Sequence, residues 1–391
     1  MRLGFHYHIP AIKKDNSIYI PGYLGRFLDS LATHSESLTC FMHSPVGSER
    51  DQMDYPLQRD NIALVDIGPH TSIPQRILSA GSVRNIISAH CDQLDLMLIR
   101  GPSPLLPVIA SVCRKMPLAL LLVGDYLAGI DDLPQPRWRK ELIRMWSYWN
   151  AQKQLKAAKL SLTFVNAHLL YQQLQGKVPN LVETRTTTLS LSDFYQREDT
   201  CQNRPIRLLY TGRIDRAKGL LDILEALYFL VKNGKDIIFD LVGMLEKGDP
   251  ILDELTMKAN LMGMSDRVIF HGYHPLGHEL FQFYKQADIY IMASQASEGF
   301  PRTIWEALAH SLPVIATKVG SIPDFIGEAA LLVEPNQPDQ LVTAITEIIT
   351  NKDLRMKSIK KGYLLAQSNT LEIRAKQMIE EMERYLSMVK S

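Results

Sequence analysis

One segment, residues 287–317, constrains the fold of this chain more than any other part of its sequence. It contains two short apolar runs, residues 287–293 and 313–317, of the kind that form strands buried on both faces. Between them lies a helical stretch that begins near Pro301, because proline suits the first turn of a helix, where its missing N–H is not needed. Strand, loop, helix and strand in this order form the unit of an open parallel α/β sheet, which binds ligands at the carboxyl ends of its strands.

Two carboxylates, Glu298 and Glu306, lie eight residues apart across the start of this helix. A carboxylate accepts hydrogen bonds from two hydroxyls at once, which suits a ribose or hexose diol. The N–H groups of Arg302, Thr303 and Ile304 and the positive end of the helix dipole can face an anion. The segment therefore predicts a site for a phosphorylated, hydroxyl-rich ligand. The alternative, that both glutamates are solvated as most are, is disfavoured by the buried strands on either side.

Two cations, Arg213 and Lys218, follow an apolar run at residues 207–210 and precede an amphipathic helix that begins near Leu220. Both therefore project from a strand-to-helix loop at the ligand-binding edge of a sheet. Fixed cations at that place can neutralise a diphosphate. On spacing alone a solvated loop is the more common outcome, since lysine and arginine are mostly exposed.

Together these motifs resemble those of retaining glycosyltransferases of family 4, which have the two-domain GT-B architecture. Residues 298–306 match the family's Glu-x7-Glu motif, residues 212–219 resemble its Gly-Arg-(Leu/Ile)-x3-Lys-Gly element, and residues 319–324 resemble its Gly-Gly-(Ile/Leu)-Pro-Glu segment. The resemblance is strong over residues 205–340 and weak before them. It implies an α/β fold class with two doubly wound, Rossmann-like domains that face each other across a cleft.

Length and apolar patterning are consistent with two such domains. A chain of 391 residues is long enough for two cores, and strand-like runs alternate with longer amphipathic ones in both halves. We expect an amino-terminal, acceptor-side domain over residues 1–200 and a nucleotide-sugar-binding domain over residues 201–370, with the hinge in the polar stretch 193–205. As in GT-B relatives, the helix at residues 371–391 is expected to cross back to the first domain. The expected strands lie at residues 3–7, 38–41, 62–66, 96–99, 119–123 and 162–164 in the first half and at 207–210, 237–242, 268–270, 289–292, 314–316 and 330–333 in the second.

The resemblance implies a role for each residue of the motifs. Arg213 and Lys218, together with the start of the helix after Pro301, hold the donor diphosphate and stabilise the negative charge that grows on the leaving nucleoside diphosphate. Glu298 contacts the hydroxyls of the transferred sugar, and Glu306 contacts the ribose. We expect retention at the anomeric carbon by internal return, in which the departing phosphate takes the acceptor proton.

Further candidates lie outside these motifs. Gly22 stands in a stretch that resembles the family's Gly-Gly-x-Gly loop, whose backbone approaches the diphosphate. Arg100 and Asp125 both follow expected strands, where relatives often carry a histidine or an acidic residue. They either bind the acceptor or donor sugar or form structural salt bridges. The main chain of the loop that contains Gly272 and Tyr273 is expected to read the base, uracil or guanine.

No metal site and no tightly bound cofactor is expected. The four cysteines are widely spaced, with no Cys-x-x-Cys pair, and no Asp-x-Asp follows a strand where a magnesium diphosphate would sit. The donor is expected to be a UDP- or GDP-linked sugar, bound as a substrate. A formal net charge of +1 gives no general attraction to nucleic acid.

Residues 136–149 are basic and aromatic, which favours a helix lying on an anionic membrane, where lipid-linked acceptors are found. The alternative is an amphipathic surface helix with its tryptophans in the core. The amino terminus lacks the apolar run of a signal peptide, so we expect a cytoplasmic protein, with peripheral contact to the inner face of the membrane left open. The acceptor is expected to be a glycan or a lipid-linked glycan.

These features favour a hexosyltransferase of bacterial polysaccharide or glycoconjugate biosynthesis. A nicotinamide-dependent oxidoreductase also has doubly wound domains, but no Gly-x-Gly-x-x-Gly follows the first strand, and Arg213 and Lys218 would have no role in it. A catalytically silent nucleotide-sugar-binding scaffold remains the alternative, because the first half departs from the family pattern.

Overall fold

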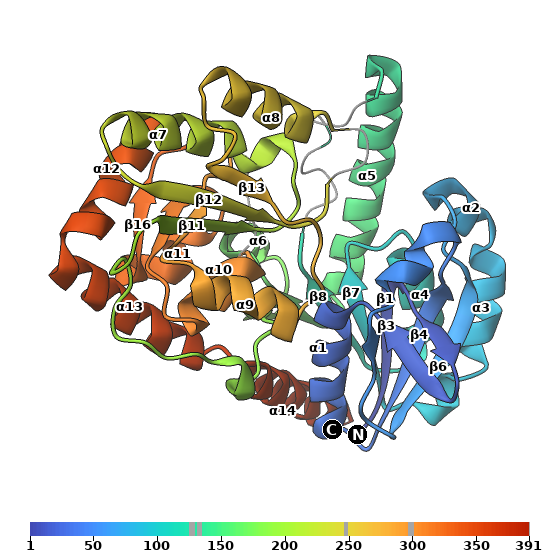
Figure 1. The fold of residues 1–391 in the computed structure, drawn as a ribbon. Helices are drawn as coiled ribbons and strands as arrows, with labels where there is room; N and C mark the ends of the chain where they lie inside the picture. Colours follow the sequence, from blue (N-terminus) through green and yellow to red (C-terminus); the bar gives the residue numbers. More distant parts are fainter. Residues whose placement is uncertain (125–129, 131–134, 246–248, 296–300, 391) are drawn as a thin grey trace. The chain divides into compact units, whose positions relative to one another are not determined.

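A computed structural model of the chain describes residues 1–124, 130, 135–245, 249–295 and 301–390. The chain divides into two compact units (Figure 1). Unit 1 consists of Met1–Thr186 and Leu371–Ser391, and unit 2 consists of Thr187–Thr370. Two of the expected site residues, Asp125 and Glu298, lie outside the described residues.

Unit 1 is built on a parallel sheet of seven strands in the order β10-β9-β8-β7-β1-β4-β6. Its strands are β1 (Arg2–Pro10), β4 (Ser37–Ser44), β6 (Ile62–Pro69), β7 (Leu96–Gly101), β8 (Leu118–Leu122), β9 (Leu162–Val165) and β10 (Asn180–Glu183). A small antiparallel sheet consists of β2 (Ile12–Lys14), β3 (Ser17–Ile20) and β5 (Tyr55–Pro56). The six strands expected in this half are present, whereas β10 and the small sheet were not expected.

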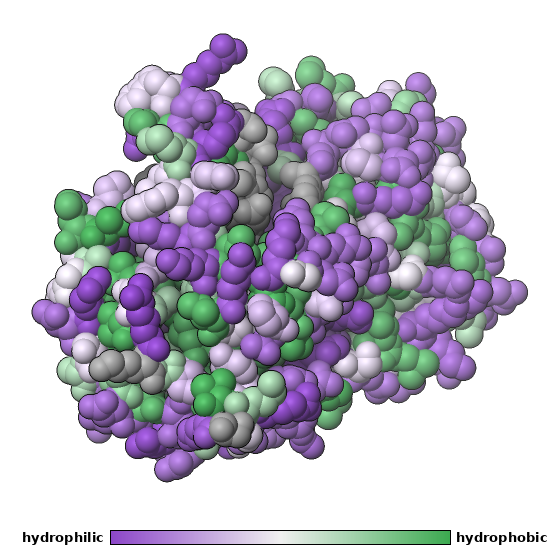
Figure 2. All heavy atoms as spheres, turned by 180° about the vertical axis from the view of Figure 1, so that it is seen from behind, coloured by the Kyte–Doolittle hydropathy of each residue, from purple (hydrophilic) through white to green (hydrophobic). Residues whose placement is uncertain are grey.

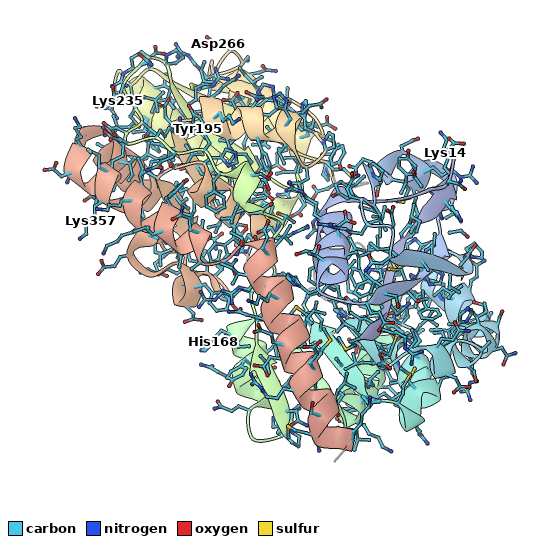
Figure 3. All side chains as sticks on the ribbon, turned by 90° about the horizontal axis from the view of Figure 1, so that it is seen from below. Lys14, His168, Tyr195, Lys235, Asp266 and Lys357 are labelled. Atoms are coloured by element: carbon cyan, nitrogen blue, oxygen red, sulfur yellow. The ribbon has the colours of Figure 1, made fainter. Side chains whose placement is uncertain are left out.

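The helices of unit 1 connect these strands and cover the sheet (Figure 1). They are α1 (Gly22–Thr33), α2 (Ile73–Leu78), α3 (Ala80–Ser88), α4 (Leu106–Val112), α5 (Arg137–Ala158), α6 (His168–Leu174) and α14 (Leu371–Lys390), with short 3-10 turns η1 (Gly47–Gln52), η2 (Cys91–Gln93) and η3 (Cys113–Lys115). Helix α14 packs against α1 (Figure 3). Its apolar residues recur every three or four positions, so one face joins the core of unit 1 through Leu371, Ala375, Met378, Ile379 and Met382.

Unit 2 is built on a parallel sheet of six strands in the order β13-β12-β11-β14-β15-β16. The strands are β11 (Ile206–Thr211), β12 (Ile237–Val242), β13 (Val268–Phe270), β14 (Ile289–Met292), β15 (Val314–Thr317) and β16 (Ala330–Val333). The helices are α7 (Leu220–Lys232), α8 (Ile251–Leu261), α9 (His278–Gln286), α10 (Arg302–Ala309), α11 (Ile322–Ile326), α12 (Pro338–Thr350) and α13 (Lys352–Gln367), with 3-10 turns η4 (Leu191–Asp193), η5 (Arg216–Lys218) and η6 (Gly327–Ala329). All six strands expected in this half are present.

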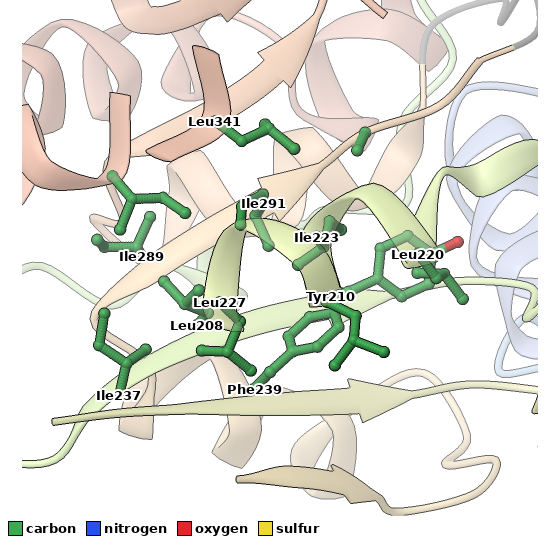
Figure 4. Packing of buried hydrophobic residues seen from close by; sticks show 14 of the residues in the cluster. Leu208, Tyr210, Leu220, Ile223, Leu227, Ile237, Phe239, Ile289, Ile291 and Leu341 are labelled. Carbon is green, nitrogen blue, oxygen red and sulfur yellow. The ribbon is translucent and has the colours of Figure 1, made fainter. Parts of the chain in front are cut away.

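The core of unit 2 lies between the sheet and its helices. Ile223 and Leu227 of α7 pack over Leu208 of β11 and Phe239 of β12 (Figure 4). Charged residues such as Lys357 lie at the surface instead (Figure 3). On the face shown in Figure 2, hydrophobic residues form scattered groups between hydrophilic ones.

The polar stretch 193–205, where we expected the hinge, packs on unit 2. The guanidinium of Arg197 donates to the backbone oxygens of Tyr284, Lys285 and Ala287 at 2.8 to 3.1 Å, which satisfies carbonyls at the end of α9. The chain passes from unit 1 to unit 2 earlier, between residues 186 and 187. Arg197 therefore fixes part of this stretch to unit 2, whereas Glu198, Gln202 and Asn203 are exposed.

Candidate active site

The topological switch point of unit 2 lies between β11 and β14. The chain builds β12 and β13 on one side of β11, and β15 and β16 on the other side of β14. The loops that follow β11 and β14 therefore leave the sheet in opposite directions from adjacent strands. In open α/β sheets this is the place where ligands bind.

The loop after β11 carries the two cations expected from the sequence. It is fixed from within, since the Tyr210 hydroxyl donates to the carbonyl of Arg213 at 2.7 Å and the Asp215 carboxylate accepts from the Ala217 N–H at 3.0 Å. The Arg213 side chain is exposed and lies 3.8 Å from Asp215. Lys218 ends the turn η5 and is partly exposed. Both cations thus lie at the carboxyl end of β11.

Close backbone contacts hold the β11 and β14 loops together. Gly219 has φ +63°, and a Cβ at this position would lie 2.0 Å from the carbonyl oxygen of Ala293, so only glycine fits. The Gln295 N–H donates to the carbonyl of Ala217 at 2.8 Å, and the Gln295 amide donates to Asp222 at 2.8 Å. The loop that carries the cations after β11 is therefore in direct contact with Ala293 and Gln295, which follow β14.

Helix α10 begins at Arg302, with Pro301 as its N-cap and not in its first turn. The N–H of Ile304 donates to the carbonyl of Pro301 at 3.1 Å and its side chain is buried. The expectation that Ile304 offers its N–H to an anion is therefore wrong, because the first turn closes on Pro301. Arg302 and Thr303 lie at the amino end of α10 and are partly exposed.

Glu306 is buried, with 4% of its surface exposed. One carboxylate oxygen accepts from the Thr188 hydroxyl at 2.9 Å and the other from the Tyr284 hydroxyl at 2.7 Å. Burial, and then the charge of Glu306, raise the pKa of Tyr284 well above its usual range, so this hydroxyl stays protonated and donates. Each oxygen can accept one more bond, which leaves capacity for the diol of a ligand.

The bonds around Glu306 continue to the start of α10. The hydroxyl of Tyr284 lies 2.5 Å from that of Thr211, and Tyr290 donates its hydroxyl to Thr303 at 2.7 Å. Tyr284 and Tyr290 stack with ring centroids 5.9 Å apart. Thr188, Tyr284 and Tyr290 had not been expected at the site, because no motif contains them and they come from separate elements.

The loop after β13 lies at the same edge of the sheet. The carbonyl of Gly272 accepts from the N–H of Gly243 at 2.8 Å, and a Cβ on Gly243 would lie 1.7 Å from the carbonyl oxygen of Gly212. The ends of β11, β12 and β13 are thus in direct backbone contact. Tyr273 follows Gly272 and is exposed. The expected base-binding loop and the expected diphosphate-binding loop therefore share one edge.

Gly22 and Arg100 belong to unit 1. Gly22 is the first residue of α1, and its N–H donates to the Asp54 carboxylate at 2.8 Å. The N–H expected to approach a diphosphate is therefore bonded within the protein. Arg100 is buried at the carboxyl end of β7, and its guanidinium lies over the ring of Tyr7, 4.7 Å from the centroid.

No group of three or more His, Cys, Asp or Glu residues among the described residues is arranged to hold a metal ion. None of their helices is both long enough and apolar enough to cross a membrane.

The two units define a GT-B glycosyltransferase fold. The structure of HepE from Anabaena, solved in complex with UDP, superposes with a TM-score of 0.73 over 98% of this chain and 100% of that chain, at 16% sequence identity. Likeness at this identity establishes the fold and leaves the activity to be argued from the site.

Residues 193–365 match the family described as glycosyl transferases group 1. Spore coat protein SA of Bacillus subtilis is 25% identical over 167 residues, 41% of this chain and 44% of that protein. The lipopolysaccharide 1,2-N-acetylglucosaminetransferase of Salmonella typhimurium is 27% identical over 190 residues, 46% of this chain and 48% of that protein. The chain thus spans less than half the length of these curated relatives.

Proposed function

We propose that this protein is a retaining glycosyltransferase of family 4. In this proposal it transfers a hexose-type sugar from a UDP- or GDP-linked donor to a glycan or lipid-linked acceptor in bacterial polysaccharide or glycoconjugate synthesis. The observation that carries the proposal is the edge at the switch point of unit 2. There Arg213 and Lys218, the start of α10 and the carboxylate of Glu306 are held by shared backbone and side-chain bonds. HepE, which shares the fold, was solved with UDP and with UDP-glucose, and this supports a nucleotide-sugar donor.

The chemistry follows from where charge develops. As the glycosidic bond breaks, negative charge grows on the leaving diphosphate, and Arg213, Lys218 and the positive end of α10 stabilise it. Glu306 binds the ribose hydroxyls, held in one orientation by Tyr284 and Thr188. The departing phosphate takes the acceptor proton, so retention needs no separate base. Protein cations and the helix terminus neutralise the charge of the diphosphate, which a metal ion neutralises in other enzymes.

A panel of donors tests the activity. The protein is incubated with UDP-, GDP- and ADP-linked sugars, and the released nucleoside diphosphate is measured with and without EDTA. We expect release from a uracil or guanine donor at a rate that EDTA leaves unchanged. Loss of activity with EDTA and recovery with Mg²⁺ would contradict metal independence. Tight donor binding with no release across the panel would support the silent scaffold in place of the enzyme.

Lys218→Ala tests the role of the cations. Because the charge on its partner grows in the transition state, the variant should lower kcat by about tenfold or more while donor binding weakens less. Arg216→Ala is the matched control, since Arg216 lies in the same turn but pairs with Glu254. A rise in KM with kcat unchanged would mean that Lys218 only binds the donor.

Helix α5 supports a lipid-linked acceptor at a membrane. Trp138, Leu142, Met145 and Trp149 are all exposed, Trp138 and Met145 at 67%, and their spacing places them on one face of the helix. The alternative that these two tryptophans lie in the core is therefore wrong. Three basic residues lie beside this face: Arg137, Arg139 and Lys153.

An exposed apolar face with a basic flank complements an anionic lipid surface. We propose that α5 rests on such a membrane. Co-sedimentation with vesicles of phosphatidylglycerol should exceed that with phosphatidylcholine and should fall for Trp138→Ser combined with Met145→Ser. Equal sedimentation of the variant and the original protein would overturn the proposal.

A further inference from the structure

Histidines gather at the carboxyl edge of the sheet in unit 1, outside the site described above. His6 and His8 lie on β1, His43 lies near the end of β4, and His70 directly follows β6. These three strands are adjacent and parallel, so their carboxyl ends lie at one edge. Arg76, on α2, joins them. Its charge contributes, after burial, to lowering the pKa of His6, His8 and His43.

Arg76 is a buried cation with two unpaired donors. Arg76 is 6% exposed. Its Nε and Nη1 are buried and have no hydrogen-bond partner within the described parts of the chain. The carboxylate whose charge acts on it is that of Glu49. That carboxylate is already engaged, because one oxygen lies 2.7 Å from Nδ1 of His70 and the other accepts from the N–H of Val46 at 3.0 Å.

The imidazoles beside Arg76 have their own unused atoms. Nδ1 of His43 lies 3.0 Å from the carbonyl oxygen of Gly68, so this nitrogen carries the proton and donates it. Burial lowers the pKa of His43 to about 4, which keeps the ring neutral near pH 7 and leaves a lone pair on Nε2. The Nε2 atoms of His43 and His70 are both buried without a partner in the described structure. The two rings are neighbours, with centroids 5.7 Å apart.

Charges of both signs act at this edge, including the Glu49 carboxylate that acts on Arg76. Arg76 and Arg100 both act on His8, whereas Asp66 acts on His43 from its exposed position on β6. His6 is satisfied, with Nδ1 2.9 Å from the carbonyl oxygen of Phe41 and Nε2 3.1 Å from the hydroxyl of Ser103.

An unpaired buried guanidinium is costly, since a buried donor left without an acceptor loses its hydrogen bonds to water, and a charged donor loses the most. A ligand that supplies the acceptors removes that cost. An oxyanion matches the planar fork of Arg76, and a hydroxyl on the same ligand matches the lone pair of His43.

We propose that Arg76, His43 and His70 form an oxyanion-binding subsite in unit 1, which takes the phosphate or carboxylate of a hydroxylated, sugar-type ligand. Its assignment to an acidic acceptor rests on the proposed glycosyltransferase function. The subsite itself does not depend on that function, because it is defined by atoms of unit 1 alone.

The test uses the whole chain and four probes: inorganic phosphate, a hexose 6-phosphate, a hexuronate and the neutral hexose, each against chloride at equal ionic strength. Binding is measured by calorimetry and by the shift in Tm. We expect phosphate to bind, the hexose phosphate or the hexuronate to bind more tightly than the neutral hexose, and the preferred probe to identify the oxyanion. Arg76→Met should weaken that binding by about tenfold or more, with Arg84→Met, an exposed arginine on α3, as the matched control.

Two outcomes would overturn the inference. One is equal binding of the acidic probes by the original protein and by Arg76→Met. The other is failure of Arg76→Met to fold in the absence of anions, which would make Arg76 a structural residue. Chemical shifts of the His43 ring provide a measurement without substitution, and they should move on addition of inorganic phosphate. If the acidic probes bind but no donor sugar is consumed, the subsite stands and the proposed function fails. If donor sugars are consumed but no acidic probe binds, the proposed function stands and the subsite fails.

Discussion

Both carboxylate oxygens of Glu306 accept hydrogen bonds from hydroxyls of its own unit. Substitution of Glu306 therefore affects the stability of the protein as well as ligand binding. Its position inside the helix could be read from the sequence. Its partners could not, because Thr188 and Tyr284 lie on elements that only the fold brings to α10. A carboxylate held in this way has its geometry set before any ligand arrives.

Glu306→Ala should therefore lower both nucleotide affinity and stability. Loss of the ribose contacts should weaken binding of the nucleoside diphosphate about ten- to a hundredfold. The hydroxyls of Thr188 and Tyr284 lose their acceptor, which should reduce the free energy of unfolding by about 1–3 kcal/mol. Calorimetry and denaturant unfolding measure the two effects, with Glu306→Gln as the control that keeps the volume and one acceptor oxygen. Unchanged affinity in a folded variant would remove Glu306 from the nucleotide site.

At the scale of elements, the strands of the two large sheets could be predicted because most of them are short, continuous apolar runs between polar loops. Strand β10 and the sheet of β2, β3 and β5 were missed, since they are short and lack such runs. The histidines and Arg76 of unit 1 were missed for another reason. They come from separate strands and a helix, so no spacing in the sequence connects them.

The contact between the β11 and β14 loops predicts that adding a single methyl group at Gly219 destabilises the protein. Gly219→Ala places a Cβ against the carbonyl of Ala293 and requires a non-glycine residue at positive φ. We expect a loss of about 2 kcal/mol or more in the free energy of unfolding and weaker donor binding, because the two loops must separate. Gly234→Ala is the matched control, since Gly234 has φ +78° but open space around its Cβ. Equal losses in the two variants would show that backbone strain alone, and not the loop contact, matters.

At the scale of the whole molecule, buried histidines predict how stability depends on pH. Burial lowers the pKa of His8, His43 and His310 to about 4 and that of His6 to about 3, from an ordinary value of 6.5. The unfolded chain therefore binds more protons than the folded one between these values, so stability should fall as the pH is lowered from about 6.5 to about 4. Each histidine contributes at most on the order of 3 kcal/mol.

Denaturant unfolding at a series of pH values measures this effect. Hydrogen bonds from Arg2 hold the pKa of Asp95 below its usual value. Protonation of Asp95 therefore lowers stability mainly below pH 4, and the change in stability above pH 4 reports the histidines. A midpoint that stays constant between pH 6.5 and 4 would contradict the prediction. His43→Asn should flatten the dependence.

Deleting residues 371–391 should destabilise unit 1 and spare unit 2. The deletion removes the apolar face of α14 from the core of unit 1 and exposes the surface of α1 beneath it, whereas the core of unit 2 contains no residue of α14. Hydrogen exchange resolved along the chain measures the two units separately. Equal loss of protection in both units would show that they unfold together.

The place of α14 also sets an order of events during synthesis. Most of unit 1 is translated before unit 2, yet its last core helix is made after the whole of unit 2. Every residue of unit 2 has been translated before that helix exists. The half of the protein that is started first is therefore finished last, and until then the nascent chain carries an uncovered apolar surface that chaperones can recognise.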